Sequence, residues 1–177
     1  MAVAGALLGL LLAAACSRTT LQSTVADQYG GADATAEMDF WDGLAVLPAV
    51  SNRDVVHALL LSFGRQAKGA SSDWKTELKA ARQRGWIASD ADPVPEETAR
   101  VGMIARVICM EAKIKGGATM RVLGPTERYA VKELNHMSWL PDLSPGHSIS
   151  GGQLLAVLSK AEDRLSGRQD TGPKEGM

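Results

Sequence analysis

The chain has 177 residues, of which 45% are apolar and 22% charged, and its formal net charge is −1. These fractions are typical of a globular protein, and the length suits one domain once an export segment is set aside. Basic and acidic residues are interspersed, so the sequence has no basic face of the kind that binds phosphates. This pattern argues against nucleic acid as a partner.

The first residues have the anatomy of an export signal. The apolar run 4–12 is too short to span a bilayer comfortably, and Ala13-Ala14-Ala15-Cys16 follows it directly. This order resembles the lipobox of bacterial lipoproteins, in which the cysteine becomes the first mature residue and carries the lipid. The resemblance implies a signal peptide at 1–16, a lipid on Cys16 and, because Ser17 follows, an outer-membrane anchor with the domain in the periplasm or at the cell surface. A soluble exported protein, cleaved at the alanine-rich site, is the alternative.

The two ends of the mature chain lack helical patterns. Residues 17–36 are polar and aperiodic, which predicts a flexible tether between the lipid and the domain. The folded part is expected to begin near Glu37, where the first helical pattern starts. Residues 166–177, with glycine, proline and charge, are expected to form a disordered tail.

One pattern occurs three times. The segments that begin at Ser51, Ala99 and Ser150 each follow a turn-rich stretch and place apolar residues at helical spacing, with a near-constant interval between them. The sequence therefore predicts an all-α domain over 37–165, built from three helix-loop-helix units around one core. The units are expected at about 37–69, 70–117 and 118–165.

Several predicted helices carry capping residues at their starts. Ser51 with Asp54, and Ser150 with Gln153, have the spacing of a capping box, in which each side chain satisfies a backbone N–H near the helix start. Asp73 is expected to cap the first helix of the middle unit. These residues fix the expected helix starts independently of the apolar pattern.

The register of the middle unit is open by a residue or more. Matching the three segments pairs Val55 with Met103 and Leu154, whereas a proline and two glutamates favour a helix start near Pro95. Between the middle and last units, residues 118–123 are expected to form a short extended segment.

The units resemble the S-layer homology (SLH) repeat. Each has a helix, a turn that in two units holds a tryptophan and an apolar residue, a polar loop and a second helix with fragments of a Thr/Ser-Arg-Ala-Glu opening. These fragments are Ser51-Asn52-Arg53-Asp54, Ala99-Arg100-Val101-Gly102 and Ser150-Gly151-Gly152-Gln153. The resemblance implies a pseudo-threefold helical domain that binds cell-wall polymers in grooves between units, with the motif arginine contributing to binding.

Five residues are therefore candidates for ligand binding. Arg53, Asn52 and Arg100 would supply hydrogen bonds, while Trp86 and Trp139 would offer stacking platforms for sugar rings. For the tryptophans, the favoured interpretation is packing in the core or between units, because a tryptophan buries a large area.

No catalytic constellation stands out. Cys109 lies in an apolar run and is expected to be a buried small hydrophobe, and His57, within an apolar helix, is expected to be packed or half-exposed and not a ligand. His136 and His147 flank one loop, but their spacing fits no zinc pattern, so neither metal nor cofactor is expected. Gly151-Gly152 fits a close helix crossing or an anion site at a helix N-terminus, and the crossing is favoured.

These features predict an exported, lipid-anchored, noncatalytic protein of the cell envelope. Its partners would be the membrane, through the lipid, and peptidoglycan or a cell-wall polysaccharide, which it would bind as an anchor or adapter. The alternative is a structural lipoprotein that docks on another protein in an envelope complex.

Overall fold

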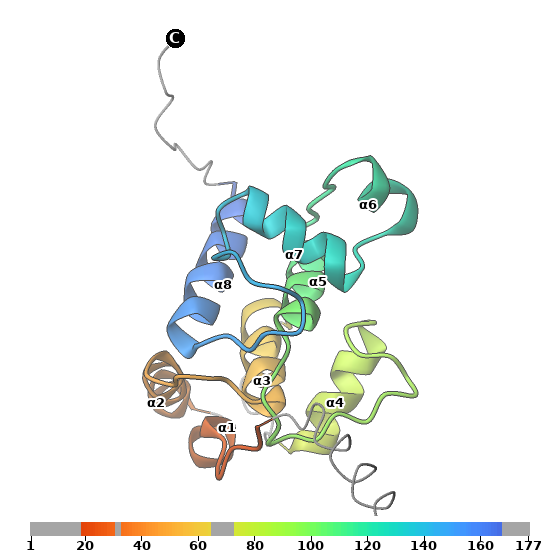
Figure 1. The fold of residues 1–177 in the computed structure, drawn as a ribbon. Coiled ribbons are helices and arrows are strands. Elements are labelled where there is room, and N and C mark those ends of the chain that lie inside the picture. Colours follow the sequence, from red (N-terminus) through yellow and green to blue (C-terminus); the bar gives the residue numbers. More distant parts are fainter. Residues whose placement is uncertain (1–18, 31–32, 65–72, 168–177) are drawn as a thin grey trace, which may run out of the picture.

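The computed structural model describes residues 19–30, 33–64 and 73–167, and over these ranges the chain is helical without a β-strand. The all-α prediction is confirmed. The predicted signal peptide 1–16, with Cys16, and nearly all of the predicted tail lie outside the described residues. The described helices are α1 Val25–Tyr29, α2 Ala34–Ala45, α3 Asn52–Phe63, α4 Trp74–Gln83, α5 Val101–Glu111, α6 Ala118–Leu123, α7 Glu127–His136 and α8 Gly151–Leu165 (Figure 1).

Local polar chemistry sets several helix starts as predicted. Ser51 Oγ accepts the N–H of Asp54 at 3.0 Å, and the carboxylate of Asp54 accepts the N–H of Ser51 at 3.4 Å. Ser150 and Gln153 form the same capping box at α8. Asp73 caps α4. Each of these caps satisfies N–H groups that a helix start leaves without a partner in its own helix.

The middle unit differs from the expectation of a helix start near Pro95. Helix α5 begins at Val101, and Arg100 occupies the capping position without a side-chain cap bond. The backbone ahead of it is used elsewhere: the carbonyls of Pro95 and Glu97 accept the N–H groups of Arg53 and the neighbouring Asn52. That stretch cannot also be helical, because its carbonyls serve the start of α3.

The later helix start moves the repeat alignment by one residue. Counted from the capping positions of α3, α5 and α8, the equivalent of Val55 and Leu154 is Ile104, and all three side chains are completely buried. Met103, which the sequence alignment placed there, is only partly buried. By burial, Ile104 and not Met103 occupies in α5 the position that Val55 holds in α3 and Leu154 in α8.

The backbone segments that precede α3, α5 and α8 meet and bond to one another. Val50 donates its N–H to Ile149 O at 3.0 Å, and Ala99 donates to Val50 O at 2.9 Å. Each helix then donates its first N–H to the segment of another unit, because a buried helix start needs partners from elsewhere. The bonds are Asn52 N to Glu97 O at 2.8 Å, Val101 N to His147 O at 2.9 Å and Gly151 N to Leu47 O at 2.9 Å.

The first helices of the middle and last units end in the same way. Gly85 and Ser138 adopt positive φ values of 72° and 55° directly after α4 and α7. The tryptophans that follow, Trp86 and Trp139, each donate their backbone N–H back to a carbonyl near the end of the preceding helix, at 3.0 and 2.8 Å. This geometry closes the helix and turns the chain toward the loop.

The core lies around α3 and α5. In α3, 9 of 12 residues are buried, and in α5 seven of 11, whereas α4 buries three of 10 and α8 five of 15. Figure 1 shows α3 and α5 inside the molecule, with the other helices arranged around them. The burial counts therefore separate central helices from covering ones.

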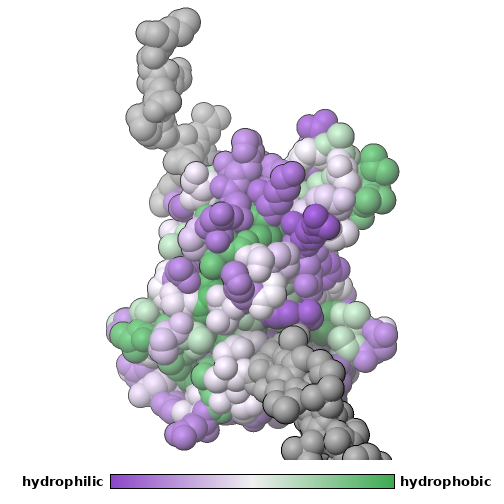
Figure 2. All heavy atoms as spheres, viewed as in Figure 1, coloured by the Kyte–Doolittle hydropathy of each residue, from purple (hydrophilic) through white to green (hydrophobic). Residues whose placement is uncertain are grey.

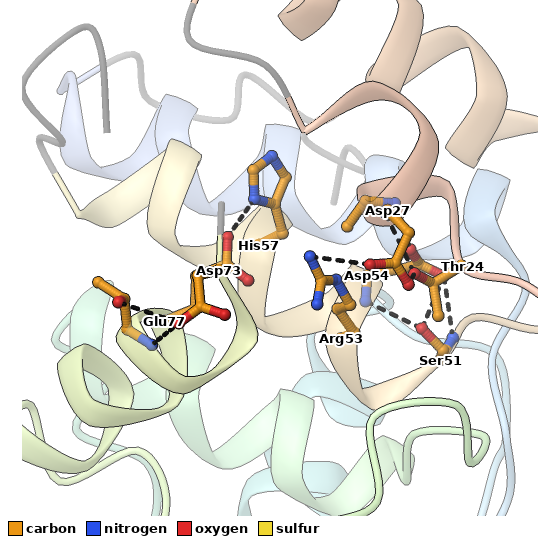
Figure 3. Close-up of polar contacts among 10 residues, drawn as sticks. Thr24, Asp27, Ser51, Arg53, Asp54, His57, Asp73 and Glu77 are labelled. Carbon is orange, nitrogen blue, oxygen red and sulfur yellow. Dashed lines mark hydrogen bonds and ion pairs between the residues drawn. The ribbon is translucent and has the colours of Figure 1, made fainter. Parts of the chain in front are cut away.

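The N-terminal part of the described chain differs from the predicted tether 17–36. Helix α1 packs against α2 and α3, and Ala26 is 1% exposed. Ala26 donates its N–H to the buried carboxylate of Asp54 at 2.9 Å, and Asp27 pairs with Arg53 at 3.0 Å (Figure 3). A five-residue helix has no visible period, so these contacts with α3 gave no signal in the sequence.

Residues 118–123 form helix α6 and not the extended segment that was expected. Gly116 and Gly124 bound it with φ values of +57° and +75°, which only glycine adopts freely. Met120 is 5% exposed and holds one side of the helix against the protein. A glycine at each end and one buried side chain are therefore what stabilise this short helix.

Gly151 allows α8 to approach the end of α2. A Cβ atom at Gly151 would lie 1.6 Å from the carbonyl oxygen of Leu44, and its N–H already serves Leu47 O. The close-crossing interpretation of Gly151-Gly152 is therefore confirmed at Gly151. At Gly152 a Cβ would have ordinary contact, 3.6 Å from Ala45 O.

We expect Gly151→Ala to destabilise the protein by about 3 kcal/mol, because α8 must move away from a backbone carbonyl that cannot yield. Gly152→Ala is the matched control and should be neutral or stabilising by up to about 1 kcal/mol, since alanine favours helix. Urea denaturation followed by circular dichroism measures both. Equal effects of the two changes would contradict the close approach at Gly151.

Candidate functional site

A cleft of about 930 Å³ lies between α3, α5 and the loop that joins α4 to α5. Its wall comes from α3, from the loop between α4 and α5, from α5 itself and from Glu127 at the start of α7. Val56, Ile87 and Met103 supply apolar surface, and polar groups lie among them. Pockets of this size with an apolar wall and a few polar groups are typical of small-ligand sites.

Arg100 is the exposed cation of the cleft. Its side chain is 46% exposed, and its Nη2 atom lies 3.9 Å from Oε1 of Glu127. An ion pair that long on the surface is weak, so the guanidinium has donors to offer a ligand. At the equivalent position of the other two units a serine caps the helix, whereas Arg100 gives no side-chain cap bond. The middle unit therefore lacks a cap and has a cation at the cleft.

Arg106 is the second cation of the cleft and is held in place. Its two terminal nitrogens donate to the carbonyls of Trp86 and Gly85, both at 3.0 Å. Asn52 also holds the wall, because its Nδ2 donates to the carbonyl of Val94 at 2.8 Å. These bonds tie the loop to α3 and α5, so the cleft keeps its shape without a ligand.

The lining of the cleft also contains acidic residues. Asp92, Glu97 and Glu127 line it together with Arg100 and Arg106. Carboxylates and guanidinium groups beside apolar surface suit a ligand that has hydroxyl groups and apolar faces, as a sugar does.

The structure brings together three of the five predicted binding residues, Asn52, Trp86 and Arg100. Arg53 lies outside the cleft lining, with its side chain 11% exposed and paired with Asp27 at 3.0 Å (Figure 3). Trp139 also lies outside the lining. Arg53 therefore joins α3 to α1 and does not line the cleft.

The two tryptophans are buried. Trp86 is 1% exposed and donates its indole N–H to Glu111 at 2.7 Å, and Trp139 is 8% exposed. Stacking on a sugar ring needs an open aromatic face, which these burials do not leave. The core interpretation is confirmed for both residues.

Arg106 and Glu127 were missed from the sequence. Arg100, Met103 and Arg106 follow one another at three-residue steps, so they fall near one side of α5, and this spacing was the available signal for Arg106. Glu127 had no such signal, because it joins the cleft only through the packing of α7 on α5.

His57 and Glu77 form a buried pair between α3 and α4 (Figure 3). His57 Nδ1 lies 2.5 Å from Glu77 Oε1, and the two residues are 4% and 1% exposed. The ring of Phe40 packs edge-on against His57 with 4.5 Å between centroids. Neither residue lines the cleft. Of the two states expected for His57, packed or half-exposed, the structure shows the packed one.

The remaining histidines are His136 and His147. His147 Nδ1 accepts the N–H of Ser144 at 3.2 Å, within the loop before α8. Over the ranges that the structure describes, no three His, Cys, Asp or Glu side chains are grouped so that they could hold a metal ion.

Comparison with protein-family models, curated proteins and solved structures found no match for this chain. The functional argument therefore starts from the geometry of the cleft and from the residues that line it. In the described part of the chain, none of the helices has the length and hydrophobicity needed to cross a membrane.

We expect Glu77→Leu to cost about 3 kcal/mol of stability, because it leaves His57 buried without its partner. The double variant His57→Leu, Glu77→Leu should recover most of this loss, since an apolar pair replaces a polar one. Urea denaturation of the single and double variants tests the pair. If the double variant is less stable than Glu77→Leu, the two residues do not act as a pair.

We expect the thiol of Cys109 to be unreactive in the folded protein. Burial, together with the nearby charge of Glu133, raises the pKa of Cys109 to about 12, so the thiol is neutral at pH 8. In a Cys16→Ser background, an aromatic disulfide reagent should react at least about a hundredfold more slowly than in urea. Rapid reaction without urea would mean that α5 is not packed in solution.

Proposed function

We propose that this chain is an exported, lipid-anchored, noncatalytic envelope protein that binds peptidoglycan or a cell-wall polysaccharide in the cleft beside Arg100. The observation that carries the proposal is a cleft of about 930 Å³ between α3, α5 and the loop that joins α4 to α5, with an exposed arginine at the motif position. The SLH family, which the sequence resembles, binds wall polymers in grooves between units.

The chemistry of the cleft supports a polysaccharide ligand. Arg100 and Arg106 offer donors to carboxylates and hydroxyl groups, while Glu127 offers acceptors. Val56 and Met103 give apolar surface for the faces of sugar rings. Because Arg106 is already bonded to backbone carbonyls, Arg100 is the residue that we assign to direct ligand binding.

The bonding among the helix starts supports an SLH-like arrangement of the units. The segment before α5 accepts the first N–H of α3, and the segment before α8 accepts the first N–H of α5. The turn after α2 accepts the first N–H of α8. This cyclic order is what a pseudo-threefold assembly of three units requires. We propose that arrangement for the three units on this ground.

The lipid anchor belongs to the same proposal. Ala13-Ala14-Ala15-Cys16 is the sequence that supports it. Thr19 accepts the N–H of Thr98, so the described fold begins only a few residues after Cys16. A lipid on Cys16 would hold the domain close to the membrane surface, with little tether between them.

Co-sedimentation of the detergent-solubilised full chain with purified sacculi tests the function. We expect the parent chain to pellet, and Arg100→Gln to weaken binding by about 10- to 100-fold, because a charge-assisted hydrogen bond is lost. The same change at the exposed Arg128, outside the cleft, is the matched control and should bind as the parent does.

Arg53→Gln separates the cleft from the rest of the motif. Its loss should loosen α1 and lower stability without a direct effect on binding, since Arg53 pairs with Asp27 and not with the cleft. If the parent chain does not pellet, or if Arg100→Gln and Arg128→Gln bind equally, the cleft is not a wall-polymer site. In that case the protein-docking alternative becomes the one to test.

A further inference from the structure

Helix α6 carries an exposed apolar face. Val122 is 82% exposed and Leu123 63% exposed, while Met120 on the other side is buried. Thr119, Val122 and Leu123 are spaced three and four residues apart, so they share one side of the helix. The anchoring of Met120 therefore holds two aliphatic side chains out toward solvent.

The surroundings of this face are basic. Lys113, Lys115 and Arg121 are exposed, and residues 112–126 contain neither Asp nor Glu. Within the ranges the structure describes, none of these three cations takes part in an ion pair. The α6 surface, as we call it, is thus apolar and positively charged, and consists of Lys113, Lys115, Arg121, Val122 and Leu123.

Helix α2 carries an exposed apolar face with the opposite charge. Met38 is 64% exposed and Val46 81% exposed, and with Asp42 they follow at four-residue steps along one side. Residues 33–50 contain neither Lys nor Arg, and their four carboxylates are exposed. We call this the α2 surface, and it consists of Met38, Asp39, Asp42 and Val46, since Asp33 and Glu37 fall on the other side of the helix.

The two surfaces lie at opposite ends of the molecule. Figure 1 shows α6 at the upper right and α2 at the lower left, and Figure 2 shows hydrophobic residues at the surface in both places. One chain therefore cannot bring its own α6 surface onto its own α2 surface. A contact between them joins two copies head to tail and leaves one surface of each kind free for the next copy.

We propose that the α6 surface of one copy docks on the α2 surface of a second copy. Both partners have the right chemistry, because aliphatic side chains meet aliphatic side chains while the three cations face Asp39 and Asp42. Contact between two α6 surfaces would place like charges together, which is unfavourable. The proposal does not depend on the cleft, since the cleft lining includes no residue of either surface.

Cysteine cross-linking of the full chain in detergent tests the contact. One copy carries Val122→Cys and an affinity tag, the other carries Met38→Cys, and both carry Cys16→Ser, so Cys109 remains as a buried thiol. We expect the mixed disulfide dimer to form about tenfold faster than with a partner that carries Gln83→Cys, an exposed position at the end of α4. Raised salt should slow the reaction.

A charge exchange makes the test specific. Arg121→Glu in the first copy should slow cross-linking about tenfold, and Asp42→Arg in the second copy should restore it, because the pair then has opposite charges again. Circular dichroism checks that the variants fold, which their exposure predicts. A rate equal to the Gln83 control, faster cross-linking of Val122→Cys chains with each other, or failure of the exchange to restore the rate would each overturn the proposal.

Discussion

Of the helices that the structure describes, α3, α5 and α8 begin in the interior, and a helix that begins there has N–H groups that neither water nor its own turns can satisfy. In α3, α5 and α8 the first of these groups donate to carbonyls of other units, such as Glu97, His147 and Leu47. The start of each helix therefore depends on the chain of a different unit. This mutual dependence explains why the short segments between helices lie together at the centre and why the carbonyls of residues 95 and 97 are not available to extend α5.

The same constraint produces the cleft in which we propose that a ligand binds. Because the segment before α5 must lie against the start of α3, the loop from Trp86 to Glu97 is drawn toward α3, and a cleft forms along it. Arg100 stands at the edge of this cleft in the position where α3 and α8 have a capping serine. Loss of a capping side chain costs about 1 kcal/mol. Arg100 places a cation at the cleft where a serine would cap the helix, and this is the physical basis for the proposal that Arg100 binds a ligand.

The polar contacts that fasten α1 show how a weakly patterned segment becomes part of the fold. Asp54 belongs to the capping box of α3, and the same carboxylate accepts the N–H of Ala26. Arg53, its neighbour, pairs with Asp27. The first turn of α3 thus caps its own helix and bonds to α1. It also contributes Asn52 to the cleft wall. The cleft lining includes no residue of the α2 or α6 surface, so the proposed wall binding and the proposed association between copies do not compete for one surface.

The sequence by itself determined the helical class and the capped starts at Ser51, Asp73 and Ser150. These features depend on residues close together in the chain, where spacing is a direct record of the contact. Only the tertiary structure decided that α5 begins after Arg100, that α1 and α6 are folded helices, and that Glu127 joins the cleft. Each of these outcomes depends on backbone or side-chain partners far away in the chain, and a local pattern carries no information about which distant carbonyl or carboxylate will be brought within reach.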